Sequence, residues 1–252
     1  MKHFPTILSH EIRMLLVSPS TYIATVLFLG FMGTIFTRIL EDYSTVQETS
    51  PAHTFFSLFW FPVFFMVPLL TMKCLAEERR LGTIETLLTT PVSTTEVVLG
   101  KYGAAYFLYI LLWGSTGGFF YILHRFAGDA RFLDRGPLIG GYLFIAVSGL
   151  LFVALGVFAS SLSRNQAVAF VLAFTMLFGL IIGLSFLPDV QALNSEMLRP
   201  LKSAVEYAQV TQHLEDFTRG VVDTRQLLFY LSGTVLTLIF SILSVEAKLL
   251  HS

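Results

Sequence analysis

Six long stretches of the chain contain no Asp, Glu, Lys or Arg, and they constrain its fold more than any other feature. The hydrocarbon core of a bilayer is about 30 Å thick, and a helix crosses it with roughly 20 apolar residues. Each stretch reaches that length. The six stretches are Met14–Thr37, Pro51–Met72, Tyr102–Leu123, Gly136–Ser163, Asn165–Pro188 and Gln226–Val245. The pattern predicts an all-α membrane protein with six transmembrane helices.

The composition also indicates that lipid is the main solvent of the chain. Hydrophobic residues make up 54% and charged residues 13% of the sequence, against about 25% charged residues in ordinary globular proteins. A charge at the centre of a membrane helix costs about 2.5–3.5 kcal/mol, which explains why charges lie in the connections. The alternative, a soluble all-α bundle, requires polar outer faces that these stretches lack. We expect one transmembrane domain over residues 1–252, with spans at about 18–39, 54–75, 101–123, 137–161, 166–187 and 226–246.

The segment before the first span has the pattern of an amphipathic helix. Its apolar residues fall at helical spacing, at Phe4, Ile7, Leu8, Ile12, Leu15 and Leu16. Polar residues take the other side, at Thr6, Ser9, His10 and Arg13. Proline lacks an N–H donor and disfavours a helical residue before it, so Ser18 and Pro19 end this helix. We expect an N-terminal interfacial helix, with the start of the first span as the alternative.

The connection between the second and third spans is short and highly charged. Between Lys73 and Lys101 it carries Glu77, Glu78, Arg79, Arg80, Glu85 and Glu96. Gly82 and Pro91 bound a short amphipathic helical turn, Thr83–Thr90, with Ile84, Leu87 and Leu88 on one side. Such a loop can dock on a partner outside the membrane, and a solvated charged hairpin fits the same pattern equally well.

The connection Asp189–Arg225, between the fifth and sixth spans, is long and also charged. Apolar residues recur in it at helical spacing, and Pro200 suits the first turn of a helix. We expect two short surface helices there.

Small residues four positions apart occur in three of the spans. The pairs are Gly114 and Gly118, Gly156 and Ser160, and Gly179 and Gly183. Small side chains let helix backbones approach closely in a membrane, so these pairs favour a packed bundle.

The chain carries no motif for nucleotide binding or metal ligation. Gly100–Lys101 is followed by Tyr102 and lacks the upstream glycine of a phosphate-binding loop. The six histidines are scattered, and the single Cys74 excludes an internal disulfide. The uncharged spans argue against a proton-driven transporter or a carboxylate-based intramembrane protease. We expect no catalytic residue, metal or cofactor in this chain, and a net charge of −1 gives no basis for nucleic-acid binding.

Two segments carry a resemblance to a known family. The run Glu77 to Ser93, followed by Gly100–Lys101, resembles the cytoplasmic loop of ABC-2 type transporter permeases. More narrowly, it is similar to the permease branch associated with gliding motility and nitrous oxide reductase maturation. The run His213 to Asp223, which leads into residues 227–232, is similar to that branch as well.

The resemblance implies a single ABC-2 type transmembrane domain that serves as the permease subunit of an ATP-binding cassette transporter. A separate ABC ATPase subunit would bind ATP and Mg²⁺, and a second permease copy or a related permease would complete the pore. A periplasmic or extracellular accessory protein would be a further partner. The chain would lie in the bacterial cytoplasmic membrane with both termini in the cytoplasm. The charge distribution does not decide this orientation, since the 16 Lys and Arg residues divide equally between the two sides.

The resemblance also implies two groups of functional residues. The ATPase-coupling loop between spans two and three would comprise Glu77, Glu78, Arg79, Arg80, Gly82, Thr83, Glu85, Leu87, Leu88 and Pro91. The short extracytoplasmic helices between spans five and six would include His213, Phe217, Gly220 and Asp223.

Two other functions fit a chain of this kind. A membrane scaffold or assembly subunit would anchor soluble partners without moving a substrate. An ion channel fits less well, because no selectivity filter or ring of charges is evident. The substrate of a transporter is not encoded in any pattern of the sequence.

Overall fold

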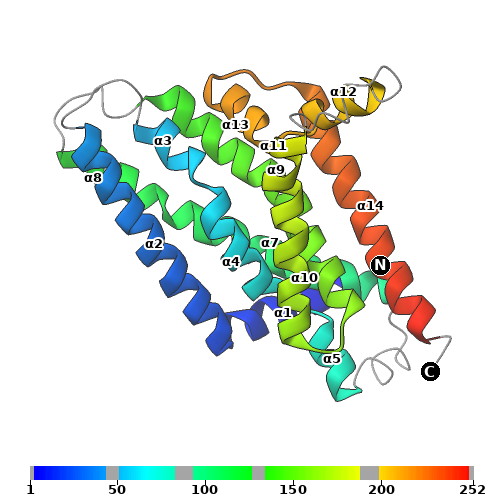
Figure 1. Cartoon of the computed structure of the whole chain (residues 1–252). Coiled ribbons are helices and arrows are strands. Elements are labelled where there is room, and N and C mark those ends of the chain that lie inside the picture. Colours follow the sequence, from blue (N-terminus) through cyan, green and yellow to red (C-terminus); the bar gives the residue numbers. More distant parts are fainter. Residues whose placement is uncertain (1–2, 44–50, 83–92, 127–133, 188–198, 250–252) are drawn as a thin grey trace.

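The computed structural model describes residues 3–43, 51–82, 93–126, 134–187 and 199–249 and is helical throughout (Figure 1). No strand occurs among these residues. The helices are α1 (Phe4–Val17), α2 (Pro19–Tyr43), α3 (Pro51–Ser57), α4 (Trp60–Thr71), α5 (Ala76–Leu81), α7 (Thr94–Ser115), α8 (Gly117–Phe126), α9 (Arg135–Leu162), α10 (Gln166–Phe178), the π-helical turn η2 (Gly179–Gly183), α11 (Leu184–Phe186), α12 (Arg199–Tyr207), α13 (Val210–Thr218) and α14 (Thr224–Leu249).

Six helical stretches of the described chain are long and apolar enough to cross a membrane. They are Pro19–Glu41, Trp60–Leu81, Thr94–Phe126, Arg135–Leu162, Gln166–Phe186 and Thr224–Ala247. This confirms the predicted all-α fold class with six membrane-spanning helices. The assignment of residues 1–252 to a single domain stays a prediction.

The short helices gather at the two ends of the bundle. In Figure 1, α1 and α5 lie at the lower end, whereas α12 and α13 lie at the upper end. Residues far apart in the chain therefore share one end, and the described residues of the two predicted functional groups lie at opposite ends.

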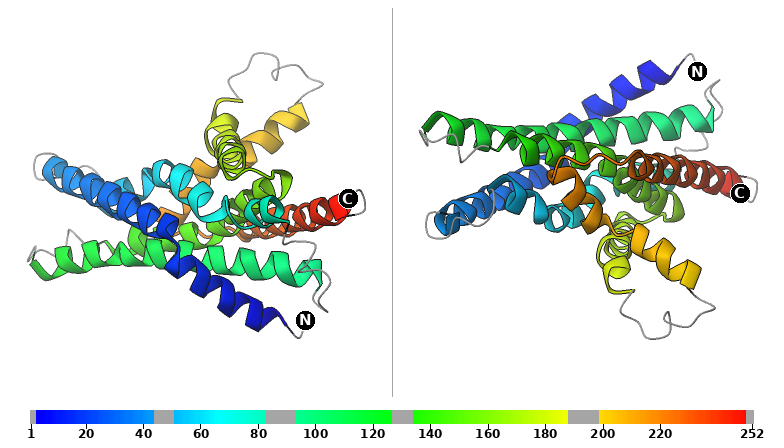
Figure 2. Two further views of the ribbon diagram at one scale, coloured as in Figure 1. Left: turned by 90° about the horizontal axis from the view of Figure 1, so that it is seen from below. Right: turned by 90° about the horizontal axis from the view of Figure 1, so that it is seen from above.

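The N-terminal helix α1 is separate from the first span, as the sequence predicted. Ser18 adopts an extended conformation between α1 and α2, and Pro19 opens the span. Side by side with α7 (Figure 2), α1 packs its half-buried face against that helix. One detail of the pattern was wrong: Leu16 is 43% exposed, and Glu11 lies on the packed face in its place. An ion pair with α7, described below, accounts for that exchange.

Helix α9 lies at the centre of the bundle and contacts α3, α4, α7, α10, α13 and α14. Four glycines allow these close contacts. A methyl group at Gly140 would overlap the Phe217 carbonyl of α13, and one at Gly141, Gly149 or Gly156 would overlap the side chain of Phe56, Tyr109 or Thr71. Helices in lipid gain little from hydrophobic burial against each other, so close backbone approach carries much of their association.

Only one of the three predicted small-residue pairs packs closely within the described chain. Gly156 lies against Thr71, and Ser160 hydrogen-bonds to the start of α5. A methyl group at Gly114, Gly118 or Gly179 would meet no other atom within 4 Å. The spacing of small residues therefore does not identify which helix faces are in contact.

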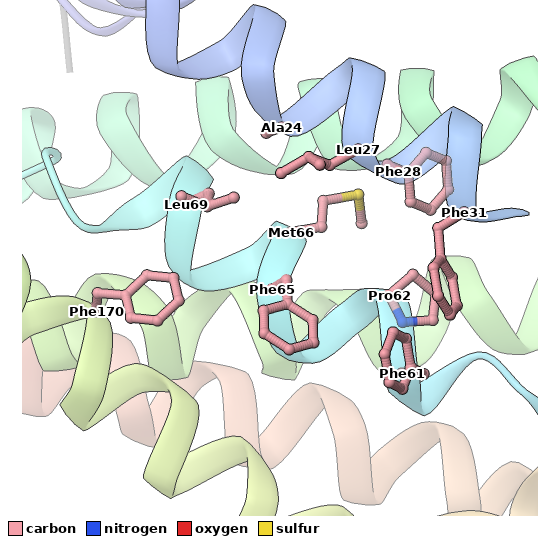
Figure 3. Close-up of a pocket in the computed structure, with 10 residues that line it drawn as sticks. All are labelled: Ala24, Leu27, Phe28, Phe31, Phe61, Pro62, Phe65, Met66, Leu69 and Phe170. Atoms are coloured by element: carbon pink, nitrogen blue, oxygen red, sulfur yellow. The ribbon is translucent and has the colours of Figure 1, made fainter.

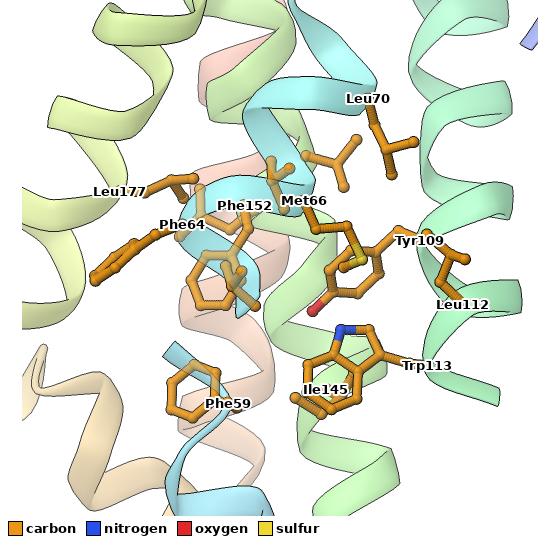
Figure 4. Close-up of a cluster of buried hydrophobic side chains, with 14 of the residues drawn as sticks. Phe59, Phe64, Met66, Leu70, Tyr109, Leu112, Trp113, Ile145, Phe152 and Leu177 are labelled. Atoms are coloured by element: carbon orange, nitrogen blue, oxygen red, sulfur yellow. The ribbon is translucent and has the colours of Figure 1, made fainter. Parts of the chain in front are cut away.

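Aromatic and aliphatic side chains fill the space between α4, α7 and α9 (Figure 4). Phe59 packs edge-on against Phe144 at a centroid distance of 5.1 Å. Tyr109 and Trp113 are also buried in this cluster, and Figure 4 shows their hydroxyl and indole nitrogen directed toward each other. These side chains belong to one connected cluster of buried hydrophobic residues within the described chain.

The third span is interrupted at Thr116, where α7 meets α8. The Ser115 and Thr116 hydroxyls donate to the carbonyls of Leu112 and Trp113, three residues earlier. Such side-chain bonds compete with the helical ladder, and the following Gly117 weakens it further. The span consequently reaches Phe126 in two segments.

We predict that Gly140→Ala destabilises the protein by about 1–3 kcal/mol, because the added methyl group forces α9 and α13 apart. Gly118→Ala is the matched control, since open space surrounds that glycine. Thermal unfolding in lipid nanodiscs measures both variants. Equal unfolding temperatures for the two variants would show that the α9–α13 contact is not tight.

Candidate functional site

The predicted coupling segment is described only at its two flanks. Thr83, Glu85, Leu87, Leu88 and Pro91 lie outside the described residues. The preceding flank is α5 and the following flank is the start of α7. The site is therefore built from these two flanks and from the helices that hold them.

A serine from the central helix holds the start of α5. The Ser160 hydroxyl accepts hydrogen bonds from the Leu75 and Ala76 N–H groups, both at 3.0 Å. It donates in turn to the Met72 carbonyl at 3.2 Å. The first N–H groups of a helix have no partner within it, so Ser160 replaces the missing local cap. Gly82, at φ 68°, ends α5 in the left-handed conformation that glycine adopts easily.

The four adjacent charges of α5 divide into an outward pair and an inward pair. Arg80 and Glu77 face outward, 59% and 36% exposed, with Arg80 Nη2 3.9 Å from Glu77 Oε1. Glu78 and Arg79 face inward and bond to other helices. The family resemblance implied that all four belong to one loop that contacts a partner.

Arg79 connects α5 to the ends of two spans. Its guanidinium donates to the Ser161 carbonyl of α9, and Nη2 donates to the Ser244 carbonyl of α14 at 3.1 Å. The Ser161 carbonyl lies in the last turn of α9, where carbonyls lack partners within the helix, and a cation also suits the negative end of the helix dipole. Arg79 is thus a bridge within the chain.

Glu78 takes part in a buried group of three charges. Lys101 Nζ lies 2.7 Å from Glu78 Oε1 and 2.7 Å from Glu11 Oε1. The Lys101 side chain is 6% exposed, and each carboxylate side chain is 19% exposed. We call these three residues the Lys101 triad, which joins α1, α5 and α7. The sequence analysis missed its role; the available signal was a lysine in the second turn of an apolar helix.

The following flank of the coupling segment is also fixed to α1. Ser93 and Glu96 form a capping box at the start of α7, in which each side chain accepts the backbone N–H of the other residue. Glu96 Oε1 also accepts the His3 N–H at 3.3 Å. Helix α1 therefore binds the following flank directly and is linked to the preceding flank through Lys101.

An apolar pocket of about 340 Å³ opens between α2, α4 and α10 (Figure 3). Its lining residues are Ala24, Leu27, Phe28, Phe31, Phe61, Pro62, Phe65, Met66, Leu69 and Phe170. Phe31 and Phe61 stack at its edge with a centroid distance of 4.2 Å. No lining side chain is ionisable, so the pocket suits a hydrocarbon or aromatic group rather than an ion.

The four predicted outer residues come together where α13 meets α14. His213 is 2% exposed, and its Nε2 lies 2.8 Å from the Tyr207 carbonyl while Nδ1 lies 3.0 Å from the Tyr230 hydroxyl. Because a carbonyl only accepts, Nε2 carries the proton and Nδ1 accepts from Tyr230. Phe217 packs against α9, and the left-handed Gly220 ends α13.

Asp223 completes this arrangement at the start of the last span. Its Oδ1 accepts the Arg225 N–H at 2.8 Å. His213, Gly220 and Asp223 therefore shape the connection into α14. Within the described residues, no three His, Cys, Asp or Glu side chains are placed to hold a metal ion.

Stability should fall at low pH because of His213. Burial lowers the pKa of His213 below its usual value, while the Tyr207 carbonyl and the Asp216 and Asp223 carboxylates oppose that shift. As the pH falls, the unfolded chain then binds a proton at a higher pH than the folded chain does. The contribution of His213 to stability is therefore fully present above about pH 6.5 and decreases below it.

Unfolding in nanodiscs between pH 8 and pH 5 measures this effect. We expect the decrease to be smaller in His213→Gln and unchanged in His10→Gln, since His10 is exposed on α1. A His213→Gln variant that retains the full pH dependence would contradict the prediction.

The sequence matches a known protein family. Residues 34–205 match the family model described as ABC-2 family transporter protein. The matched stretch runs from α2 into α12 and includes α5, Lys101 and most of the apolar pocket. None of the curated proteins matches the chain. Because the match covers more than half of the sequence, this multi-pass membrane protein belongs to the ABC-2 family of transporter proteins.

Proposed function

We propose that this chain is a permease whose segment 83–92 receives a separate ATP-hydrolysing subunit. Membership of the ABC-2 family makes it a membrane subunit of an ABC transporter. The observation that carries the docking proposal is the division of charge on α5. Glu77 and Arg80 are left for a partner, while Glu78 and Arg79 bind α5 to α7, α9 and α14.

This arrangement suits transmission of movement from a bound partner. A force on segment 83–92 acts on α5, which is bonded to three spans, and on the capped start of α7. Nucleotide binding can shift the permease only if it favours one conformation over another. ATP and Mg²⁺ would bind in the partner subunit, and this chain would hold neither a catalytic residue nor a cofactor.

The same proposal covers location and assembly. The bundle end that carries α1 and α5 would face the cytoplasm of a bacterium, with both chain termini, and α12 and α13 would lie outside. A second permease copy or a related permease would complete the transport path, and an accessory protein could contact the outer helices. The gliding-motility and nitrous-oxide-reductase branch is the proposed placement within the family.

The apolar pocket supports a substrate with a hydrocarbon or aromatic part. The pocket lies along two membrane-spanning stretches, Pro19–Glu41 and Trp60–Leu81, and Phe170 of a third closes it. A scaffold subunit has no need for such a pocket. Stimulation of ATP hydrolysis by a substrate separates the transporter from the scaffold.

Reversing the charges of Arg80 and Glu85 should weaken ATPase binding. We expect the double variant Arg80→Glu/Glu85→Lys to retain less than about a tenth of the co-purifying ATPase, because like charges across an interface cost several kcal/mol. Co-purification from the native membrane in mild detergent measures the loss.

The matched control is Arg38→Glu/Glu41→Lys, a reversed pair at the other end of the bundle that is 81% and 66% exposed. Full ATPase recovery with the coupling-region variant would remove segment 83–92 as the docking site. Absence of any ATPase from the wild-type preparation would remove the separate energy source.

Filling the pocket should reduce stimulation by apolar substrates. Leu27→Trp places a larger side chain in the pocket. We expect the concentration of an amphipathic compound that half-maximally stimulates ATP hydrolysis to rise at least about fivefold. Val26→Trp is the control, because Val26 is 71% exposed and does not line the pocket. The same loss in both variants would indicate a general effect on the helix.

A further inference from the structure

One ammonium group holds two carboxylates that belong to different helices. Lys101 lies on α7, Glu78 on α5 and Glu11 on α1, and both Nζ–Oε1 distances are 2.7 Å. Glu78 stands just before the coupling segment, whereas Glu11 belongs to a helix outside it. The two carboxylates therefore connect the same cation to two different helices, α5 and α1.

The burial of Lys101 makes its counterions important. Its side chain is 6% exposed, and an ammonium in such surroundings is strongly disfavoured unless a negative charge compensates it. If Glu78 moved away with α5 and no other carboxylate were present, Lys101 would be left uncompensated. Glu11 prevents this, because it remains beside Lys101.

The packing of α1 keeps Glu11 in place. Ile7 lies so close to Gly100 that a methyl group there would come within 2.6 Å of its Cγ2, and Leu8 lies against Gly103. The His3 N–H bond to Glu96 fixes the beginning of α1. Glu11 is thus carried by a helix docked on α7, independently of α5.

Glu11 also repels Glu78. Two carboxylates that share one ammonium repel each other at short range, so the place of Glu78 is less favourable with Glu11 present than without it. The compensation of Lys101 by Glu11 and the repulsion of Glu78 by Glu11 act in the same direction. Both lower the free energy needed to separate Glu78 from Lys101.

We propose that Glu11 is a positioning residue that makes α5 easy to release from α7 by serving as a second counterion for Lys101. Its part in transport rests on the proposed function, in which movement of α5 follows ATPase action. The competition itself is a property of this chain alone. The proposal requires opposite effects of the two carboxylates. Loss of Glu78 makes α5 easier to separate from α7, and loss of Glu11 makes it harder.

Hydrogen–deuterium exchange of residues 76–82, in the full chain in lipid nanodiscs, tests the proposal. We expect Glu78→Gln to raise the exchange rate of these amides about tenfold and Glu11→Gln to lower it about threefold to tenfold. Glu77→Gln is the control on the same helix, because its exposed pair with Arg80 contributes little. The Ser160 and Arg79 bonds are common to all variants, so they do not affect the comparison.

A different result is expected if Glu11 and Glu78 both simply stabilise the contact between α1, α5 and α7. In that case both Glu11→Gln and Glu78→Gln raise exchange, and this outcome overturns the proposal, as does an unchanged rate in Glu11→Gln. Glu11→Met, which also removes the charge, guards against an effect specific to glutamine. Unfolding of both Glu11 variants would show that Glu11 is needed for the fold and would likewise overturn it.

The complex with the ATPase separates this inference from the proposed function. We expect Glu11→Gln to keep ATPase association and reduce substrate-stimulated hydrolysis by at least about threefold. If α5 exchange changes as expected but no ATPase binds the wild-type chain, the proposed function fails and the competition at Lys101 stands. If the ATPase binds and α5 exchange rises in Glu11→Gln, only the competition fails.

Discussion

The close approach of other helices to α9 is the constraint on which the bundle depends. Four positions on this helix, Gly140, Gly141, Gly149 and Gly156, leave no room for a methyl group beside the segments they face. Those segments belong to α13, α3, α7 and α4. In lipid, such contacts matter more than in water, because the surrounding acyl chains are as apolar as the helix surfaces. The central helix therefore positions both ends of the molecule, including α5 through Ser160.

Helix α5 is short, and its position depends on bonds to distant parts of the chain. Ser160 supplies its N-terminal cap, Arg79 reaches the ends of α9 and α14, and Glu78 shares Lys101 with α1. Six residues alone do not form a stable helix in water. Under the proposed function, these bonds would let α5 move several spans together, and the Lys101 triad would let α5 be released.

The ionic contacts around α5 and the apolar pocket lie in different parts of the bundle. The Lys101 triad and the Arg79 bonds involve α5, which lies at one end of the bundle (Figure 1), whereas the pocket between α2, α4 and α10 is lined by apolar side chains. Buried ionic groups are tolerated where they are paired and hydrogen-bonded, and a position near the ends of spans lowers their cost further. The pocket can then accept apolar groups without an ionic competitor nearby.

The sequence by itself determined the six spans, the separate α1 and the helices near residues 199–218, because hydropathy, helical spacing and proline act locally along the chain. It also showed the run of charges at residues 77–80, beside a segment whose coupling role stays a prediction. Only the tertiary structure decided that Glu78 and Arg79 turn inward while Glu77 and Arg80 face outward, and that Lys101 has two counterions. It likewise decided that Gly156 is a contact and Gly118 is not. The physical reason is that a side chain's partner depends on which distant helix packs beside it, and a local pattern carries no record of that neighbour.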